Sequence, residues 1–328
     1  MTIQATAERR IGVYGGEQLA RYGFGDGHPF GPDRHDAFWD ALTESGLKAK
    51  IRSLPPVRAR DEDVLRFHTG AYLEQVRRQS ATGQGYLDYG DTPAVVGIYE
   101  SALFVVGSTL DAVARILAGE LTRAMVPIAG LHHARRDGAS GFCVFNDCGV
   151  AIETLRHVHG IQRIVYVDID AHHGDGVFYA FDDDPELAVV DFHEDGRYLY
   201  PGTGHAEETG TGPARGTKLN VPLPPFAEDE QFLGLWSAAE RFIENFRPQF
   251  ILLQCGADAL AGDPITHLQL STAVHRQVTT SLCRIADKCC EGRLLAMGGG
   301  GYERDHTAQA WTQVVAAMVE TTARGSEQ

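Results

Sequence analysis

An apolar, β-branched run at residues 163–167 leads directly into a dense group of ionisable side chains. The run predicts a buried strand, and in open α/β sheets ligands bind beyond the carboxyl ends of such strands. Five ionisable side chains follow within eight residues: Asp168, Asp170, His172, His173 and Asp175. Because side chains alternate along an extended segment, we expect Asp168, Asp170 and His172 to point the same way, as half of a metal site. A solvated polar turn is the alternative, but such turns seldom carry adjacent histidines between acids.

Apolar runs alternate with helix-like segments along the chain. Strands are expected at residues 11–14, 125–129, 163–168, 187–192, 218–221, 249–254 and 294–297, with a long helix from Pro93 to about residue 118. Continuous apolar strands are typical of parallel sheets covered on both faces. With no internal repeat or low-complexity linker, the sequence predicts one α/β domain over residues 1–328: three layers, with a mainly parallel central sheet between helices.

The charge and the apolar content exclude several classes of protein. The formal net charge is −15 with no Lys/Arg-rich block, which disfavours direct nucleic-acid binding and favours cationic substrates. No apolar run approaches the ~20 residues of a membrane span, and residues 1–10 lack the apolar core of a secretory signal. The six cysteines form no CxxC pair, which indicates reduced thiols. We therefore expect a cytoplasmic protein without a membrane partner; an oligomer is compatible with this composition.

Four expected strands end in unusual polar or glycine-rich segments, and parallel strands would bring these ends to one rim. The four segments are His132-His133, residues 168–175, Asp258, and the tetraglycine before Tyr302. Asp170 and His172, with Asp258 from another strand, would form a three-ligand site of oxygen and nitrogen donors. Three protein ligands and an open position are the arrangement of catalytic zinc. Manganese also suits carboxylates, whereas imidazole favours zinc or ferrous iron.

The remaining polar groups fit roles around such a metal. The doublet His132-His133 could take a proton from water or return one to a leaving group. Asp168 and Asp175 could each accept a hydrogen bond from a histidine and fix its tautomer. Tyr302, after four consecutive glycines, could donate a hydrogen bond to an oxyanion.

Two other kinds of chemistry are weakly supported. Residues 298–301 could form a phosphate-binding loop, but no Lys-Ser/Thr pair follows and no GxGxxG is present. Ser140 is not in a G-x-S-x-G elbow, so a nucleophilic role is disfavoured. Cys143 and Cys255 adjoin apolar stretches, where packing is the better interpretation.

At these residues the sequence resembles the zinc-dependent histone deacetylase family, which includes bacterial acetoin-utilisation proteins and acetylpolyamine amidohydrolases. The resemblance extends over residues 23–311 and implies the arginase/deacetylase fold. It rests on Gly130-Leu131-His132-His133, Asp137-Gly138-Ala139-Ser140-Gly141-Phe142-Cys143, residues 166–176, Leu199-Tyr200-Pro201-Gly202-Thr203-Gly204, Gly256-Ala257-Asp258, and the tetraglycine with Tyr302. The run from His193 to Pro225 is most similar to the acetoin-utilisation branch.

Carried over position by position, the resemblance implies one zinc ion held by Asp170, His172 and Asp258. It also implies that His132 and His133 are the tandem catalytic histidines, bonded to Asp168 and Asp175, and that Tyr302 polarises the acetyl carbonyl. Further implied positions are the tunnel aromatics Phe142 and Tyr200, the rim residue Asp91, the substrate-contacting residues Gly141, Ile265 and Gly300, and Arg34 in an internal acetate channel.

Three positions depart from the family pattern. A potassium ion is implied near the backbone carbonyls of Asp168, Asp170 and His172, but Asp191 stands where the family usually has serine. Tyr200 replaces a common phenylalanine. Ile265 occupies the position of an acidic gatekeeper in a polyamine-selective relative, so no preference for polyamines is built in.

Together these features predict a zinc amidohydrolase that removes acetyl groups from acetyl-lysine or a similar acetylated primary amine. An acetylpolyamine amidohydrolase is the nearest alternative. A binuclear manganese ureohydrolase would need further carboxylates and gives His132-His133 and Tyr302 no role. A non-catalytic module that binds acetyl-lysine is disfavoured because all the expected catalytic positions are filled.

Overall fold

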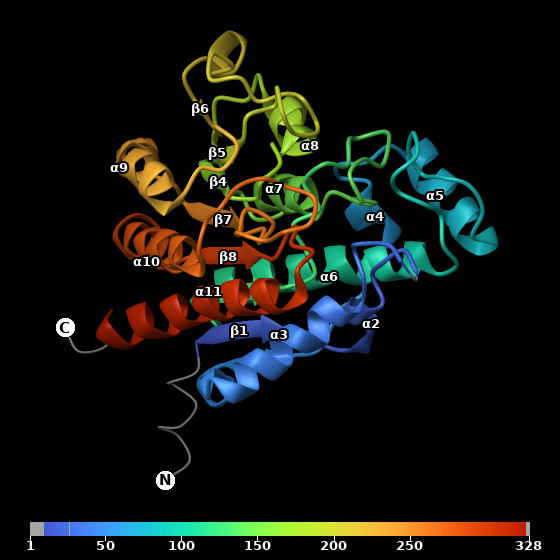
Figure 1. Cartoon of the computed structure of the whole chain (residues 1–328), viewed down its shortest axis with the longest axis horizontal. Helices are drawn as coiled ribbons and strands as arrows, with labels where there is room; N and C mark the ends of the chain where they lie inside the picture. The colour runs from blue at the N-terminus through green and yellow to red at the C-terminus, as the bar shows by residue number, and fades with distance from the viewer. Residues whose placement is uncertain (1–9, 26, 326–328) are drawn as a thin grey trace.

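An eight-stranded sheet forms the centre of the molecule, and every neighbouring pair of its strands is parallel (Figure 1). The computed structural model describes residues 10–25 and 27–325. The strand order is β2-β1-β3-β8-β7-β4-β5-β6. The strands are β1 (Ile11–Tyr14), β2 (Arg52–Leu54), β3 (Arg123–Val126), β4 (Ile164–Asp168), β5 (Leu187–Glu194), β6 (Lys218–Leu223), β7 (Phe250–Gln254) and β8 (Leu294–Met297).

Helices cover both faces of this sheet, which confirms the predicted α/β fold. On one face α3 (Asp33–Glu44), α11 (Arg304–Gly325), α10 (Thr272–Cys289) and α9 (Asp229–Phe246) pack side by side (Figure 1). On the other face lie α6 (Ile98–Leu117) and α7 (Asp147–His157). The shorter helices are α2 (Glu17–Ala20), α4 (Asp61–Val64), α5 (Gly70–Thr82) and α8 (Asp175–Phe178).

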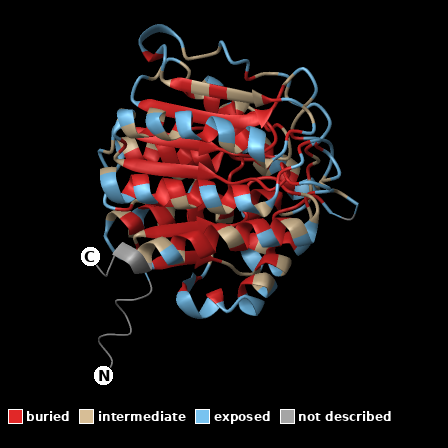
Figure 2. Cartoon of the chain, turned by 60° about the vertical axis from the view of Figure 1, so that its left-hand side comes forward, coloured by how far each residue is buried: buried red, intermediate tan, exposed pale blue. Residues whose placement is uncertain are grey.

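Burial follows the sequence pattern from which the fold was predicted. Every residue of β1, β3, β4, β5, β7 and β8 is buried, whereas the helices expose one side to solvent (Figure 2). Continuous apolar strands are stable here because helices shield both sides of the sheet. No helix of the described residues is long and apolar enough to cross a membrane.

Several element boundaries differ from the expectations. The long helix expected from Pro93 begins at Ile98, because Gly97 adopts a left-handed φ of 87° immediately before it. The strand expected at residues 125–129 ends at Val126, since Pro127 has no N–H for the ladder. Strand β2 was not predicted: it is short, lies at the sheet edge and has two exposed residues. Most of the polar start at residues 1–10 lies outside the described residues.

The strand order places the functional loops together. Strands β3, β8, β7 and β4 are consecutive in the sheet, and each is followed by one of the four unusual segments. Because the strands are parallel, all four segments emerge at the same rim.

Candidate active site and metal centre

Asp170 and His172, beyond β4, meet Asp258, beyond β7, in a buried cluster. One ligand atom of each lies within 4.8 Å of the others. His172 Nδ1 lies 3.0 Å from Asp170 Oδ1 and 3.0 Å from Asp258 Oδ2. Within the described parts of the chain, this is the one group of three or more histidine, cysteine or carboxylate side chains arranged to hold a metal ion.

The donor set of this cluster fits a divalent cation. Burial and the Asp170 carboxylate raise the pKa of Asp258 to about 7. Burial opposes charge on Asp170 as well, but His132 and His172 hold its pKa well below the usual range. Two crowded carboxylates and an imidazole, shielded from water, are stabilised by a cation between them. The separations are compatible with metal–ligand bonds of about 2.0–2.2 Å.

Backbone groups and glycines shape this centre. Asp170 Oδ2 accepts hydrogen bonds from Gly300 N at 2.8 Å and Gln254 Nε2 at 2.8 Å. A Cβ at Gly300 would lie 2.2 Å from Asp258 Oδ2, and a Cβ at Gly256 would lie 2.1 Å from Asp170 Oδ2. Only glycine therefore allows both loops to approach the carboxylates so closely.

The tandem histidines lie beside the cluster, in the loop that follows β3. His132 Nδ1 is 2.7 Å from Asp168 Oδ2, and His133 Nδ1 is 2.7 Å from Asp175 Oδ1. The pairing implied by the family resemblance is therefore present. Each carboxylate fixes its histidine with Nε2 directed away from the pair.

Asp168, which was expected to share one side with Asp170 and His172, is not a member of the three-residue cluster. Its Oδ2 accepts hydrogen bonds from His132 and from the Tyr166 hydroxyl at 2.6 Å. Strand β4 ends at Asp168, so the period of two does not continue through the next four residues.

The pKa values of the two histidines are shifted in opposite directions. Burial opposes charge on His132, but the carboxylates of Asp168 and Asp170 outweigh it and raise the pKa to about 10. Burial and the neighbouring charge of His132 lower the pKa of His133 to about 4. The neutral form of His133 therefore predominates at pH 7, which suits a proton acceptor.

Sequence reasoning missed the residues that hold the histidine loop. Asp147 accepts hydrogen bonds from the backbone N–H of Gly130 at 3.1 Å and Leu131 at 2.8 Å. Asn146 caps α7 and donates through Nδ2 to the carbonyl of His132 at 3.2 Å. The only signal in the sequence was an Asn-Asp pair at an expected helix start.

Tyr302 is positioned by another residue that the sequence analysis did not single out. Its backbone N–H donates to Asp263 Oδ2 at 2.8 Å. Asp263 Oδ1 also accepts from the N–H of Ile265 at 3.0 Å, so one carboxylate connects the two loops. Ile265 is 36% exposed, and its expected contact with substrate stays a prediction.

Arg34 lies fully inside the protein behind this loop. Its guanidinium donates to the carbonyls of Gly299 at 2.6 Å and Gly300 at 3.1 Å and stacks on Phe30 at 4.1 Å. Its Nε and Nη1 have no hydrogen-bond partner among the described residues. A buried cation with free donors is compatible with the expected acetate channel, which stays a prediction.

The two expected tunnel aromatics each pack against an expected catalytic residue. The Tyr200 ring is 5.2 Å from the His133 ring, and its hydroxyl bonds to Ser140. The Phe142 ring is 5.8 Å from that of Tyr302. Gly141 lets its loop approach the His133 ring closely. Its φ is 51°, and a Cβ there would lie 2.4 Å from His133 Cδ2.

Asp91 is exposed on the loop that precedes α6. Its carboxylate accepts the Thr92 hydroxyl at 3.0 Å, and that hydroxyl oxygen accepts the N–H of Phe142 at 3.0 Å. Partial desolvation of the carboxyl group and the nearby Asp88 carboxylate raise the pKa of Asp91 to about 6. The expected rim residue is thus connected to one tunnel aromatic.

Other singled-out residues have structural partners. His173 Nδ1 lies 2.8 Å from Thr203 Oγ1, and Cys143 and Cys255 are buried, as the packing interpretation requires. Asp191 is fully buried; its oxygens lie 2.6 Å from His193 Nδ1 and 2.9 Å from Gly174 N. The potassium ion implied at this position stays a prediction.

Residues 28–318 match the histone deacetylase domain family. The chain belongs to the histone deacetylase family. It is 36% identical over 302 residues to the acetoin utilization protein AcuC of Bacillus subtilis, covering 89% of this chain and 78% of that protein. It is 32% identical over 314 residues to histone deacetylase clr6 of Schizosaccharomyces pombe, covering 93% and 76%.

A solved structure shows the same fold. The HD domain of HDA15 superposes with a TM-score of 0.87 at 24% identity, over 95% of this chain and 89% of that one. The family membership indicates a deacetylase, which is a hydrolase, and the acetoin-utilisation proteins among the relatives confirm the resemblance noted in the sequence.

Proposed function

We propose that this histone deacetylase family member is a zinc-dependent amidohydrolase that removes acetyl groups from acetyl-lysine or a similar acetylated primary amine. We also propose that residues 1–328 act as one cytoplasmic catalytic domain. The observation that carries the activity is the convergence of three ligand side chains with the His133–Asp175 pair at one rim.

Asp170, His172 and Asp258 would hold the zinc ion. When bound there, zinc would polarise the acetyl carbonyl and lower the pKa of water. Among the described residues no fourth cysteine, histidine or carboxylate joins these three ligands, which leaves a position for water and substrate.

His133 would carry out both proton transfers, from the water and to the leaving amine. Its Nδ1 is engaged by Asp175, and its lowered pKa keeps Nε2 free to accept a proton from the attacking water. The same nitrogen would then deliver that proton to the amine that leaves. Burial and Asp258 raise the pKa of Tyr302 well above its ordinary value, so the phenol keeps its proton and can donate to the oxyanion.

Substitution of the proton-transfer group or the oxyanion donor tests this mechanism. We expect Tyr302→Phe and His133→Ala each to lower deacetylation of an acetyl-lysine peptide at least 100-fold, with zinc content unchanged by metal analysis. Tyr198→Phe, at an exposed position, is the control. Full activity in either active-site variant would contradict the mechanism.

Three measurements separate this proposal from its alternatives: metal content, relative rates on different substrates, and binding without turnover. Two manganese ions per chain would favour a ureohydrolase, whereas one zinc ion supports our proposal. Much faster turnover of acetylputrescine or acetylspermidine than of acetyl-lysine peptides would favour an acetylpolyamine amidohydrolase. Acetyl-lysine binding without any turnover would indicate a non-catalytic module.

A further inference from the structure

A cavity of about 600 Å³ lies next to the candidate active site. It shares Tyr200 with the proposed tunnel, together with Ser140, whose hydroxyl bonds to that tyrosine. Asp175, the partner of His133, also reaches its wall. This volume lies within the range of ordinary ligand sites. We call this cavity the flanking pocket.

The charged side chains of the flanking pocket are two arginines and one aspartate. Asp175 is engaged by His133, and Arg136 donates to Glu153 at 2.8 Å. Arg135 is exposed and makes no side-chain hydrogen bond or ion pair with any described residue. Its guanidinium is therefore available to a ligand, in a chain whose formal net charge is −15.

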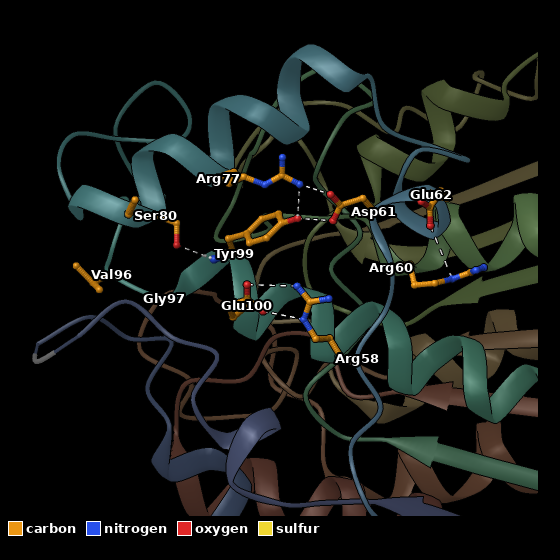
Figure 3. A pocket seen from close by; sticks show the side chains of 11 residues that line it. Arg58, Arg60, Asp61, Glu62, Arg77, Ser80, Val96, Gly97, Tyr99 and Glu100 are labelled. Carbon is orange, nitrogen blue, oxygen red and sulfur yellow. Dashed lines mark hydrogen bonds and ion pairs between the residues drawn. The ribbon is translucent and has the colours of Figure 1, made fainter.

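A second cavity, of about 680 Å³, shows the opposite situation (Figure 3). It lies between α4, α5 and the start of α6, and its three arginines all face carboxylates. Arg58 pairs with Glu100 at 2.8 Å, Arg77 pairs with Asp61, and Arg60 approaches Asp63 at 3.3 Å. An anion would have to displace these partners, whereas none blocks Arg135.

Three tyrosine side chains also line the flanking pocket. Tyr89 is 99% exposed, Tyr179 44% and Tyr200 42%. The Tyr179 hydroxyl donates to Glu208 at 2.7 Å, which fixes one ring in place. Exposed, rigid aromatic rings are suited to packing against a peptide.

We propose that the flanking pocket binds a residue next to the acetylated lysine of a polypeptide, and that Arg135 selects a carboxylate at that residue. This inference rests on the proposed deacetylase function. A guanidinium presents parallel N–H donors that match a carboxylate, and its charge disfavours a cationic neighbour such as lysine or a polyamine arm. The pocket thus opposes locally the attraction for cations that the whole chain exerts.

Sets of three acetyl-lysine peptides, one set for each flanking position, test the proposal; the members of a set differ only in the residue at that position. Glutamate, glutamine and lysine are compared at each of the two positions on either side. We expect kcat/KM at low ionic strength to be about fivefold higher for glutamate than for glutamine at one position. This preference should shrink as salt is added.

Charge variants of Arg135 assign the preference to this side chain. Arg135→Gln should bring the ratio between glutamate and glutamine peptides to about 1, and Arg135→Glu should favour the lysine peptide. Arg78→Gln is the matched control, because Arg78 is an exposed α5 residue that does not line the pocket. It should keep the wild-type ratio. An unchanged ratio in Arg135→Gln would overturn the proposal.

Fluorescence anisotropy measures the binding of the same peptides. It distinguishes failure of the pocket proposal from failure of the proposed deacetylase function. If no peptide is deacetylated but the glutamate peptide still binds about fivefold tighter through Arg135, the proposed function fails and the pocket stands. Free Nε-acetyl-lysine, with its own carboxylate, is a further ligand. Dependence on Arg135 for this amino acid alone, and for no peptide, would also overturn the proposal.

Discussion

Gly300 shows how little space separates the loops at the rim of the sheet. Its N–H donates to Asp170 Oδ2, and its α-carbon faces Asp258 closely enough that a side chain would collide with the carboxylate. This residue was expected in the glycine run before Tyr302 and, through the family resemblance, among the substrate-contacting residues. Its structural role is to let the β8 loop close over two metal-ligand candidates.

We predict that Gly300→Ala lowers zinc affinity about 10- to 100-fold, since the added methyl must displace Asp258. Competition with a chelator of known affinity measures this change. Gly138→Ala is the control, because no heavy atom of the described residues lies within 4 Å of a Cβ there. Equal zinc affinity in Gly300→Ala and wild type would contradict this prediction, because it would mean that the glycine loop moves and Asp258 stays in place.

At the scale of elements, two helix glycines have opposite surroundings. In α6, Gly107 packs against the extended segment at residues 57–59, and a Cβ would lie 2.2 Å from Val57 O and 2.3 Å from Ala59 N. The N–H of Ala59 donates to Leu103 O at 2.9 Å, which holds this segment on the helix. In α9, Gly234 is exposed, and a Cβ there would have no heavy atom within 4 Å in the part of the chain that the structure describes.

We therefore predict changes of opposite sign for one substitution. Gly107→Ala should lower the free energy of unfolding by about 1–3 kcal/mol, because the backbone must shift. Gly234→Ala should raise it by about 0.5–1 kcal/mol through the lower flexibility of the unfolded chain. Denaturant unfolding of both variants measures the difference. Destabilisation in Gly234→Ala would contradict this account of the α9 surface.

At the scale of the molecule, the candidate metal centre joins loops from two neighbouring strands. Asp170 and His172 follow β4, Asp258 follows β7, and the two strands pair over five residues. A ligand that binds only the folded arrangement stabilises the whole domain by mass action.

Removal of metal should therefore lower the melting temperature. At a zinc concentration 1,000 times the Kd, we expect about 4 kcal/mol more stability than in the chelated protein. Thermal unfolding in chelator, with zinc then restored, measures this increment, and magnesium serves as the control ion. Asp258→Asn should lose most of the increment; an undiminished response would exclude Asp258 as a ligand.

The sequence by itself determined the fold class and the chemistry of the rim. Continuous apolar runs predict buried parallel strands because the pattern is local, and polar residues at Asp168 and Asp258 mark where such strands end. The expected group of Asp170, His172 and Asp258 follows from parallel strands and the family resemblance together. Edge strand β2 escaped prediction because a short, half-exposed strand has no apolar run.

Only the tertiary structure decided how these pieces meet. The order β3-β8-β7-β4 depends on pairing between distant segments, and it alone brings His133 beside His172, with ring centroids 5.8 Å apart. Tertiary contacts also pair Asp168 with His132. They let Asp147 hold the loop before the tandem histidines, and Asp263 hold the backbone of Tyr302. Hydrogen bonds across the fold leave no periodic trace in a sequence, because each depends on where another segment of chain has packed.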